Sequence, residues 1–368
     1  MDTIGLDLHK RESQLCILAG NGTITEQRID TTRERFSAVL GNRPPARIIL
    51  EASTESEWVA QHLEKLGHEV SVADPNYAPM YATRARRVKT DRRDARALAD
   101  ALKLGAYRNA HRVSAERRHV RAELAVREAL VRTRTRYVSL AKSLVRRDGL
   151  RVSSSESHLV AKRIASLELS DTLASELMPL FQVLAPINEQ IAAADRRIEA
   201  LTKSDSDVAL LSTAPSIGPI AASAIVATID DITRFNSAHQ LEAFLGLVPG
   251  ERSSGEKRRV GKITKAGNSR ARYLMVEAGW RILRSKNEDT AALRSWALLI
   301  ATRRGKRVAV VALARRLSGI LHAMWRDGKS YDAVMLRIPR SAMLDFFFDR
   351  PAASGQVDAA ARMDFTRF

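Results

Sequence analysis

Two aspartates three positions apart are the residues whose types and spacing most suggest chemistry in this sequence. Asp91 and Asp94 lie in segment 89–95, whose composition favours a helix. At this spacing both carboxylates leave the same helix face, where they can contribute to a divalent-cation site if further acids lie nearby. The simpler interpretation is that the surrounding arginines, which include Arg92 and Arg93, only neutralise two surface acids.

Two more acids stand near the ends of short apolar segments that we expect to be strands. Asp7 lies in segment 4–8, and Glu51 ends segment 46–51. A continuous apolar run of this kind is typical of a strand that is buried on both faces. The elements expected around them are strands at 14–19, 23–29 and 69–73 and helices at 32–40 and 56–66.

The predicted order is three meandering strands followed by helix, strand, helix, strand and helix, which is the order of the ribonuclease-H-like α/β fold. In that fold the first and fourth strands lie side by side, so Asp7 and Glu51 would meet at one edge of the sheet. The helix that carries Asp91 and Asp94 would bring two more carboxylates there. Four acids this close require cations because like charges repel, and their oxygens select magnesium or manganese. Two such ions can activate an attacking oxygen and stabilise a leaving one.

Two alternatives to this metal site stay open. Asp7 and Glu51 can instead be strand-end residues that face water. Actin-like ATPases and sugar kinases also open with an Ile-Gly-Leu-Asp strand, but they need glycine-rich phosphate loops later in the chain. The sequence contains no such loop in a suitable context, and its high positive charge disfavours a small-nucleotide enzyme.

The composition points to a polyanionic partner. The 368 residues carry 60 Lys and Arg against 42 Asp and Glu, a net charge of +18. Arginine is the commoner base and binds phosphate bidentately, so nucleic acid is the expected partner. Cys16 is the only cysteine, which suits a reducing cytosol. Without a secretory pattern or an apolar run of membrane-spanning length, we expect a soluble cytoplasmic protein that has no membrane partner.

The middle of the chain predicts a coiled-coil arm. A helix is expected over 114–147 and a second one around 187–201, pairing as an antiparallel arm or with another subunit. The predicted seams are Val126, Leu130, Thr133, Tyr137, Leu140 and Leu144 in the first helix and Ile187, Ile191, Ala194, Ile198 and Leu201 in the second. The first helix also bears a set of arginines that either contact phosphate or are simply solvated: Arg117, Arg118, Arg121, Arg127, Arg132, Arg134 and Arg136.

A second stretch with chemical potential lies at 246–268. It holds Ser253 and Ser254 in a basic loop, where nearby cations can bind a phosphodiester and an activated hydroxyl can attack it. The alternative is a phosphate-binding loop in which the serines are only turn residues. Segment 210–220 precedes an apolar helix and predicts a helix-hairpin-helix-like element, with an ordinary helix–turn–helix corner as its alternative.

Four regions follow from these patterns. They are an α/β nuclease-like domain at 1–112, a basic coiled-coil region at 113–205, a mainly helical serine-bearing domain at 206–340 and a tail at 341–368.

Taken together and in this order, the motifs resemble those of the insertion sequence 110 family of transposases, whose relatives include the Piv-type invertases. Ile4-Gly5-Leu6-Asp7, Leu50-Glu51-Ala52 and segment 89–95 are similar to the DEDD pattern of that family's RuvC-like domain. Its serine-bearing domain is matched by four motifs: Pro215-Ser216-Ile217-Gly218, Gly246-Leu247-Val248-Pro249, Ser253-Ser254-Gly255 and Lys265-Ala266-Gly267-Asn268. Glu256 stands where many relatives have glycine.

The resemblance implies roles for individual residues. Asp7, Glu51, Asp91 and Asp94 would bind Mg²⁺, for which Mn²⁺ can substitute. Ser254, which directly precedes the glycine, would attack DNA and form a covalent phosphoserine, in preference to Ser253. The nucleic-acid-binding residues would be Arg92, Arg93, Arg252, Lys257, Arg258, Arg259, Lys262 and Lys265.

The resemblance also implies partners. They are donor and target DNA, a structured bridge RNA encoded beside the gene, and further copies of the chain in a dimer or tetramer, with the acids of one subunit facing the serine of another. The protein would act in the bacterial cytoplasm, on the nucleoid when bound to DNA. The competing functions are a hydrolytic junction nuclease that uses only the metal site and a non-enzymatic nucleic-acid-binding protein.

Overall fold

A computed structural model describes residues 1–81, 90–153, 156–251 and 260–333. The chain divides into two compact units, Met1–Val113 and Ser114–Phe368. The second unit contains both the predicted coiled-coil region at 113–205 and the predicted serine-bearing domain at 206–340. The boundary between these two regions therefore stays a prediction. The predicted tail lies outside the described residues.

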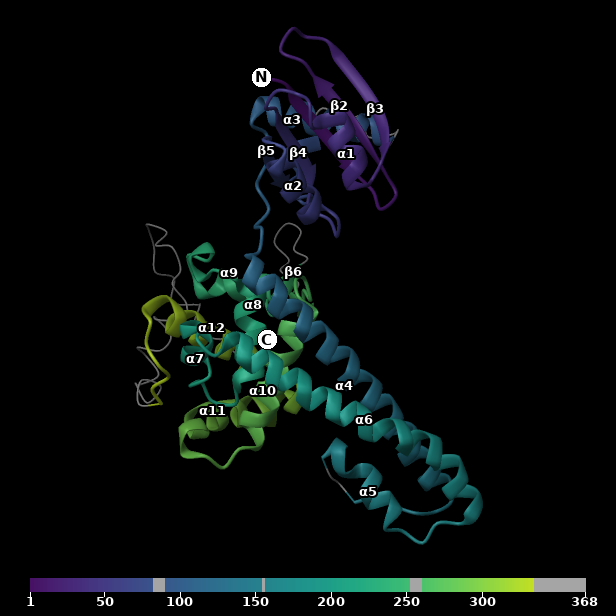
Figure 1. Ribbon diagram of the computed structural model, residues 1–368. Helices are drawn as coiled ribbons and strands as arrows, with labels where there is room; N and C mark the ends of the chain where they lie inside the picture. The colour runs from purple at the N-terminus through teal and green to yellow at the C-terminus, as the bar shows by residue number, and fades with distance from the viewer. Residues whose placement is uncertain (82–89, 154–155, 252–259, 334–368) are drawn as a thin grey trace, which may run out of the picture. The chain divides into compact units, whose positions relative to one another are not determined.

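The first unit is an α/β domain built on one five-stranded sheet with the order β3-β2-β1-β4-β5 (Figure 1). Its strands are β1 (Thr3–Leu8), β2 (Glu12–Leu18), β3 (Ile24–Asp30), β4 (Arg47–Glu51) and β5 (Glu69–Ala73). Its helices are α1 (Arg33–Leu40), α2 (Ser56–Lys65), the 3-10 turn η1 (Ala78–Tyr81) and α3 (Asp91–Leu104). The first three strands are antiparallel, and β1 runs parallel to β4 as predicted.

Successive side chains of β1 point to opposite faces of the sheet, and each face packs against different helices. Ile4 and Leu6 join the core that α1 and α2 cover, together with residues such as Phe36 and Leu63. Gly5 lies on the opposite face, against α3, where Ile49 of β4 packs under the same helix. Asp7 has the parity of Gly5 and Glu51 has that of Ile49, so both acids belong to the α3 face.

The second unit begins with a long helical arm (Figure 1). It consists of α4 (Ala115–Arg147), η2 (Ser157–Leu159), α5 (Val160–Ala165) and α6 (Asp171–Thr202). Helices α4 and α6 pack along each other. They run antiparallel, because Glu123 pairs with Arg197 near one end and Arg147 pairs with Glu176 near the other.

Tyr137 and Leu144 of the predicted seam pack against the apolar core of the arm, but other residues of that seam are exposed. Val126 and Leu140 are 50% and 48% exposed, whereas Val120, Leu124 and Val138 are buried. The buried stripe of α4 comprises Val120, Leu124, Val138, Ala141 and Val145. Packing against α6 and α8 decides which of two apolar stripes is covered, and the spacing alone does not.

Four of the seven arginines expected on the surface of this helix contact other elements of the second unit, and Arg132 pairs with Glu128 of α4 itself. Arg117 pairs with Asp205, and Arg127 pairs with Asp195. The Arg134 side chain donates to the Asn188 side chain, and burial lowers the pKa of its guanidinium. Arg121 donates to the carbonyl oxygens of Ala227 and Thr228, which end helix α8. These four arginines therefore stabilise the fold, and the prediction of phosphate contact concerns the others.

The remaining helices pack around one large apolar core. The elements are α7 (Ser206–Leu211), α8 (Pro219–Ile229), η3 (Ile232–Arg234), α9 (Ala238–Phe244), β6 (Pro249–Glu251), β7 (Val260–Ile263), α10 (Ser269–Arg284), η4 (Glu288–Thr290), α11 (Ala291–Arg304) and α12 (Lys306–Asp327). Among the described residues, α12 alone is long and apolar enough to cross a membrane, contrary to the prediction that no such run exists. Most of it is buried in this core, as expected of the central helix of a domain.

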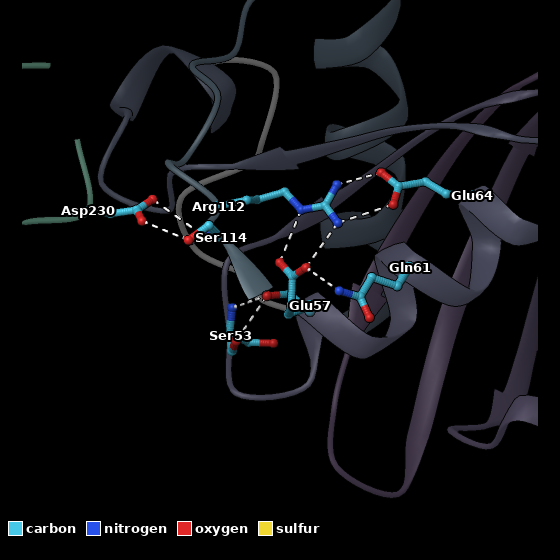
Figure 2. A network of polar contacts seen from close by, with 8 residues as sticks. Ser53, Glu57, Gln61, Glu64, Arg112, Ser114 and Asp230 are labelled. Atoms are coloured by element: carbon cyan, nitrogen blue, oxygen red, sulfur yellow. Dashed lines mark hydrogen bonds and ion pairs between the residues drawn. The ribbon is translucent and has the colours of Figure 1, made fainter. Parts of the chain in front are cut away.

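The end of the first unit and the start of the second are each fixed by polar contacts, which Figure 2 shows. The Arg112 guanidinium donates bidentate hydrogen bonds to the carboxylates of Glu57 and Glu64 on α2. These hydrogen bonds raise the pKa of Arg112. Ser114 caps α4 by accepting from the Arg117 amide, and its hydroxyl donates to Asp230 at 3.0 Å.

Candidate functional site

Asp7, His9 and Asp91 form a cluster at the end of β1. The His9 Nε2 atom lies 3.5 Å from Oδ2 of Asp7 and 3.4 Å from Oδ1 of Asp91. One ligand atom from each of the three residues lies within 4.8 Å of the others. Two oxygen donors and one nitrogen donor at this separation suit a divalent cation.

Close packing between β1 and α3 brings the two carboxylates together. A β-carbon on Gly5 would lie 2.0 Å from the carbonyl oxygen of Ala95 and 2.5 Å from the amide nitrogen of Ala99, so α3 rests directly on the strand backbone. Asp7 is two residues beyond Gly5, on the same face of the sheet, and Asp91 is one helical turn before Ala95. The contact at Gly5 therefore sets the separation of the two acids.

The start of α3 is itself well defined. Thr90 is the N-cap, and its side chain accepts a hydrogen bond from the Arg93 amide. Asp91 and Asp94 fall in the first turn, where the helix dipole stabilises negative charge. Asp94 is 5% exposed, so this carboxylate is buried at the helix start.

Glu51 occupies the position beside Asp7 in the neighbouring strand. The parallel register pairs Leu6 with Leu50, and each acid is the next residue in its strand. The carboxylate oxygens of Glu51 and Asp94 do not belong to the close group formed by Asp7, His9 and Asp91. The structure thus gathers Asp7 and Asp91 directly and places Glu51 and Asp94 on the adjoining strand end and helix turn.

Two arginines near Asp91 contact other carboxylates. The Arg92 Nε atom donates to Glu26 of β3 at 2.6 Å, and Arg96 lies 3.9 Å from Asp100 on its own helix. Within the described part of the chain, the imidazole of His9 lies 3.4 Å from Asp91. The segment that holds Arg84, Arg86 and Arg87 lies outside the described residues.

His9 is the site residue that the sequence interpretation missed. The available signal is its spacing, because Asp7 and His9 are two positions apart in an extended segment and therefore point to one side. Strand β1 ends at Leu8, so this prediction requires the alternation of side-chain direction to continue one residue beyond the strand.

Both predicted nucleophiles, Ser253 and Ser254, lie outside the described residues, as do the predicted DNA-binding residues Arg252, Lys257, Arg258 and Arg259. The structure describes the strands on either side of them. Strands β6 and β7 are antiparallel, with Pro249 opposite Ile263 and Glu251 opposite Val260. Lys262 and Lys265 of the predicted set are exposed.

The other residues of the serine-segment motifs have evident structural roles. Gly246 and Gly267 have φ angles of 69° and 75°, and a β-carbon on Gly267 would lie 1.8 Å from the carbonyl oxygen of Phe244. Asn268 caps α10 by accepting from two amides. Arg272 on that helix donates to the carbonyl oxygens of Leu245 and Ala266, before β6 and after β7. These contacts hold both ends of the segment against α9 and α10.

Segment 210–220 joins two helices in the structure, as both interpretations of it require. Helix α7 ends at Leu211, Ser216 in the connection has a φ of 64°, and Gly218 and Pro219 begin α8. Phosphate binding at this element stays a prediction.

Two models of known protein families match this chain. Residues 4–147 match the DEDD transposase model of IS110 elements, and residues 208–294 match the model described as the IS116/IS110/IS902 transposase family.

Curated relatives resemble the chain over most of its length. A probable family 20 transposase of Pseudomonas aeruginosa is 29% identical over 88% of this chain and 96% of its own. The transposase of IS1111A from Coxiella burnetii is 27% identical over 89% and 90% of the two chains. The transposase of IS1328 from Yersinia enterocolitica is 26% identical over 88% and 97%.

Proposed function

Because this chain belongs to the IS116/IS110/IS902 family of transposases, we propose that it moves its element with two sets of residues. The first is a divalent-metal site made by Asp7, Glu51, Asp91 and Asp94. The second is Ser254, which forms a covalent bond to DNA. The observation that supports the metal site most directly is the close approach of Asp7 and Asp91 across the contact between Gly5 and Ala95.

The strand arrangement of the first unit supports the proposal of a ribonuclease-H-like nuclease domain. Its strand order places β1 beside β4, and the parity of both strands turns Asp7 and Glu51 to the face that α3 covers. Carboxylate oxygens from that face and from the start of α3 would hold Mg²⁺ or Mn²⁺. The bound cation would neutralise charge on the scissile phosphate and lower the pKa of an attacking hydroxyl. Buried Asp94 would keep its carboxylate fixed relative to Asp91.

In this proposal, Ser254 explains how cut DNA strands are rejoined. In the proposed step, the Ser254 Oγ atom bonds to phosphorus while the bond from phosphorus to a deoxyribose oxygen breaks. The proton leaves Oγ, and the departing oxygen gains one. Because the phosphodiester energy is kept in the phosphoserine, the reverse attack by another DNA hydroxyl restores a strand without a high-energy cofactor. Transposition requires this rejoining, and hydrolysis does not provide it.

The charge of the chain supports nucleic-acid partners. A net charge of +18 favours binding to phosphate backbones. We propose that donor and target DNA are bound together with a structured bridge RNA, by a dimer or tetramer in which the acids of one subunit act with the serine of another. Sequencing of RNA that co-purifies with the protein tests the guide: a discrete RNA matching DNA beside the gene supports it, and only degraded cellular RNA contradicts it.

Trapping of the covalent intermediate tests the chemistry. DNA labelled at its 5′ or 3′ end should remain attached to the wild-type protein under denaturing conditions. Ser254→Ala should abolish this adduct, and the neighbouring Ser253→Ala is the matched control that should retain it. Cleavage that persists in Ser254→Ala without any adduct in the wild type would instead identify a hydrolytic nuclease.

A further inference from the structure

We infer that His9 is an additional ligand of the metal site, beside its four acids, and gives it a preference for manganese over magnesium. This inference rests on the proposed metal site and adds a nitrogen donor to it. The evidence is geometric: the His9 Nε2 atom lies between the carboxylates of β1 and α3, at 3.5 Å from one oxygen and 3.4 Å from the other.

These distances fit ligands that share a cation better than they fit direct hydrogen bonds. An N–H···O bond is usually about 2.7–3.2 Å long, and both separations exceed that range. Ligands placed about 2.1 Å from a common ion are about 3.0 Å apart in octahedral geometry and about 3.4 Å apart in tetrahedral geometry. The observed separations of 3.4 Å and 3.5 Å lie at and just above the upper end of this interval.

The His9 backbone is fixed on the side away from the cluster. Its carbonyl oxygen accepts a hydrogen bond of 2.8 Å from the Thr31 hydroxyl. That hydroxyl also lies 2.6 Å from the buried Ser13 hydroxyl, and the Thr31 amide donates to the carbonyl oxygen of Arg11. The turn after β1 is therefore tied to the segment that precedes α1.

The donor set determines which ions the site prefers. Oxygen ligands suit magnesium, whereas an imidazole nitrogen adds affinity for manganese, cobalt and zinc. Asp7 is mostly covered and His9 is about half exposed, so the nitrogen would complete the solvent side of the site. Loss of His9 should therefore weaken Mn²⁺ binding much more than Mg²⁺ binding.

Direct metal titration tests this inference without a turnover assay. Mn²⁺ binding to the full chain is followed by electron paramagnetic resonance of the free ion, and Mg²⁺ affinity is obtained by competition. We expect His9→Gln to raise the Mn²⁺ dissociation constant about tenfold or more and to change the Mg²⁺ constant less than threefold. His158→Gln in the arm is the matched control and should leave both constants unchanged.

The variants separate failure of this inference from failure of the proposed site. Asp7→Asn should lose Mn²⁺ and Mg²⁺ binding together. If Asp7→Asn loses binding while His9→Gln binds Mn²⁺ like the wild type, His9 is not a ligand and the metal site stands. If Asp7→Asn binds both ions normally, the proposed site itself is wrong. Thermal unfolding of each variant without metal shows whether it is folded.

Discussion

Gly5 of β1 and Ala95 of α3 are in backbone contact, since a β-carbon added to Gly5 would lie 2.0 Å from the Ala95 carbonyl oxygen. Cys16, opposite Gly5 in β2, packs against Ala95 and Ala99 in the same small cluster. Small residues on both sides therefore let α3 approach the sheet closely enough for Asp91 to meet Asp7.

Gly5→Ala should disturb both stability and metal binding. The new methyl group must displace α3, which we expect to cost about 1–3 kcal/mol of unfolding free energy and to separate Asp91 from Asp7. Denaturant unfolding and Mn²⁺ titration measure the two effects. Gly20→Ala is the control, because a β-carbon there meets only one atom, at 3.8 Å. Wild-type values for Gly5→Ala in both measurements would show that the contact does not position the acids.

Leu124 and Val126 provide a test of the arm register. Leu124 is 3% exposed and packs with Val120 and residues of α6 and α8, whereas Val126 is half exposed. Leu124→Ala should lower the unfolding free energy by about 2–4 kcal/mol, and Val126→Ala should change it by less than about 0.5 kcal/mol. Chemical denaturation measures both values. A larger cost for Val126→Ala would restore the seam predicted from the sequence.

Arg272 should act on DNA attachment and leave metal binding unaffected. Its Nη1 atom donates at 3.1 Å to Leu245 and at 3.0 Å to Ala266, carbonyl oxygens on either side of the serine segment. Arg272→Met leaves both carbonyls without this donor, so we expect the yield of trapped phosphoserine adduct to fall about tenfold, or about 1.4 kcal/mol, with unchanged Mn²⁺ affinity.

Arg284→Met on the same helix is the control for Arg272, because the Arg284 guanidinium donates to the Trp280 carbonyl within α10 and lies over the Trp280 ring. Normal adduct yield in Arg272→Met would show that the segment does not depend on this bridge.

Cys16 should be unreactive in the folded protein. Burial raises the pKa of its thiol to about 11, so the reactive thiolate is scarce at pH 8. Because Cys16 is the only cysteine, modification by a thiol reagent at pH 8 should follow the rate of unfolding. Fast labelling without denaturant would contradict this burial.

The same shift affects stability at high pH. The unfolded thiol loses its proton near pH 9 and the folded thiol only near pH 11, so the folded state binds more protons between these values. The contribution of Cys16 to stability is therefore complete below pH 9 and is lost as the pH rises towards 11. The difference in unfolding free energy between the wild type and Cys16→Ala should shrink over that interval. A constant difference would contradict the shift.

Local patterns in the sequence determined much of the first unit. The strands expected at 23–29 and 69–73 and the helix expected at 32–40 are observed at Ile24–Asp30, Glu69–Ala73 and Arg33–Leu40. The order of those elements then placed β1 beside β4 and Asp7 beside Glu51. The serine chemistry depends on the sequence and its family resemblance, because Ser254 lies outside the described residues.

Packing between distant segments decided the rest. His9 lies close to both Asp7 and Asp91 because α3 rests on Gly5 and carries Asp91 to the end of β1, a contact between residues about ninety positions apart. Helix α4 carries two apolar stripes at similar spacing, and α6 and α8 determine that the one with Leu124 is buried. Gly246 and Gly267 acquire their roles from close backbone approaches of the same kind. Residue spacing fixes which side chains share a face of one element, but the burial of that face depends on the shape of the elements packed against it.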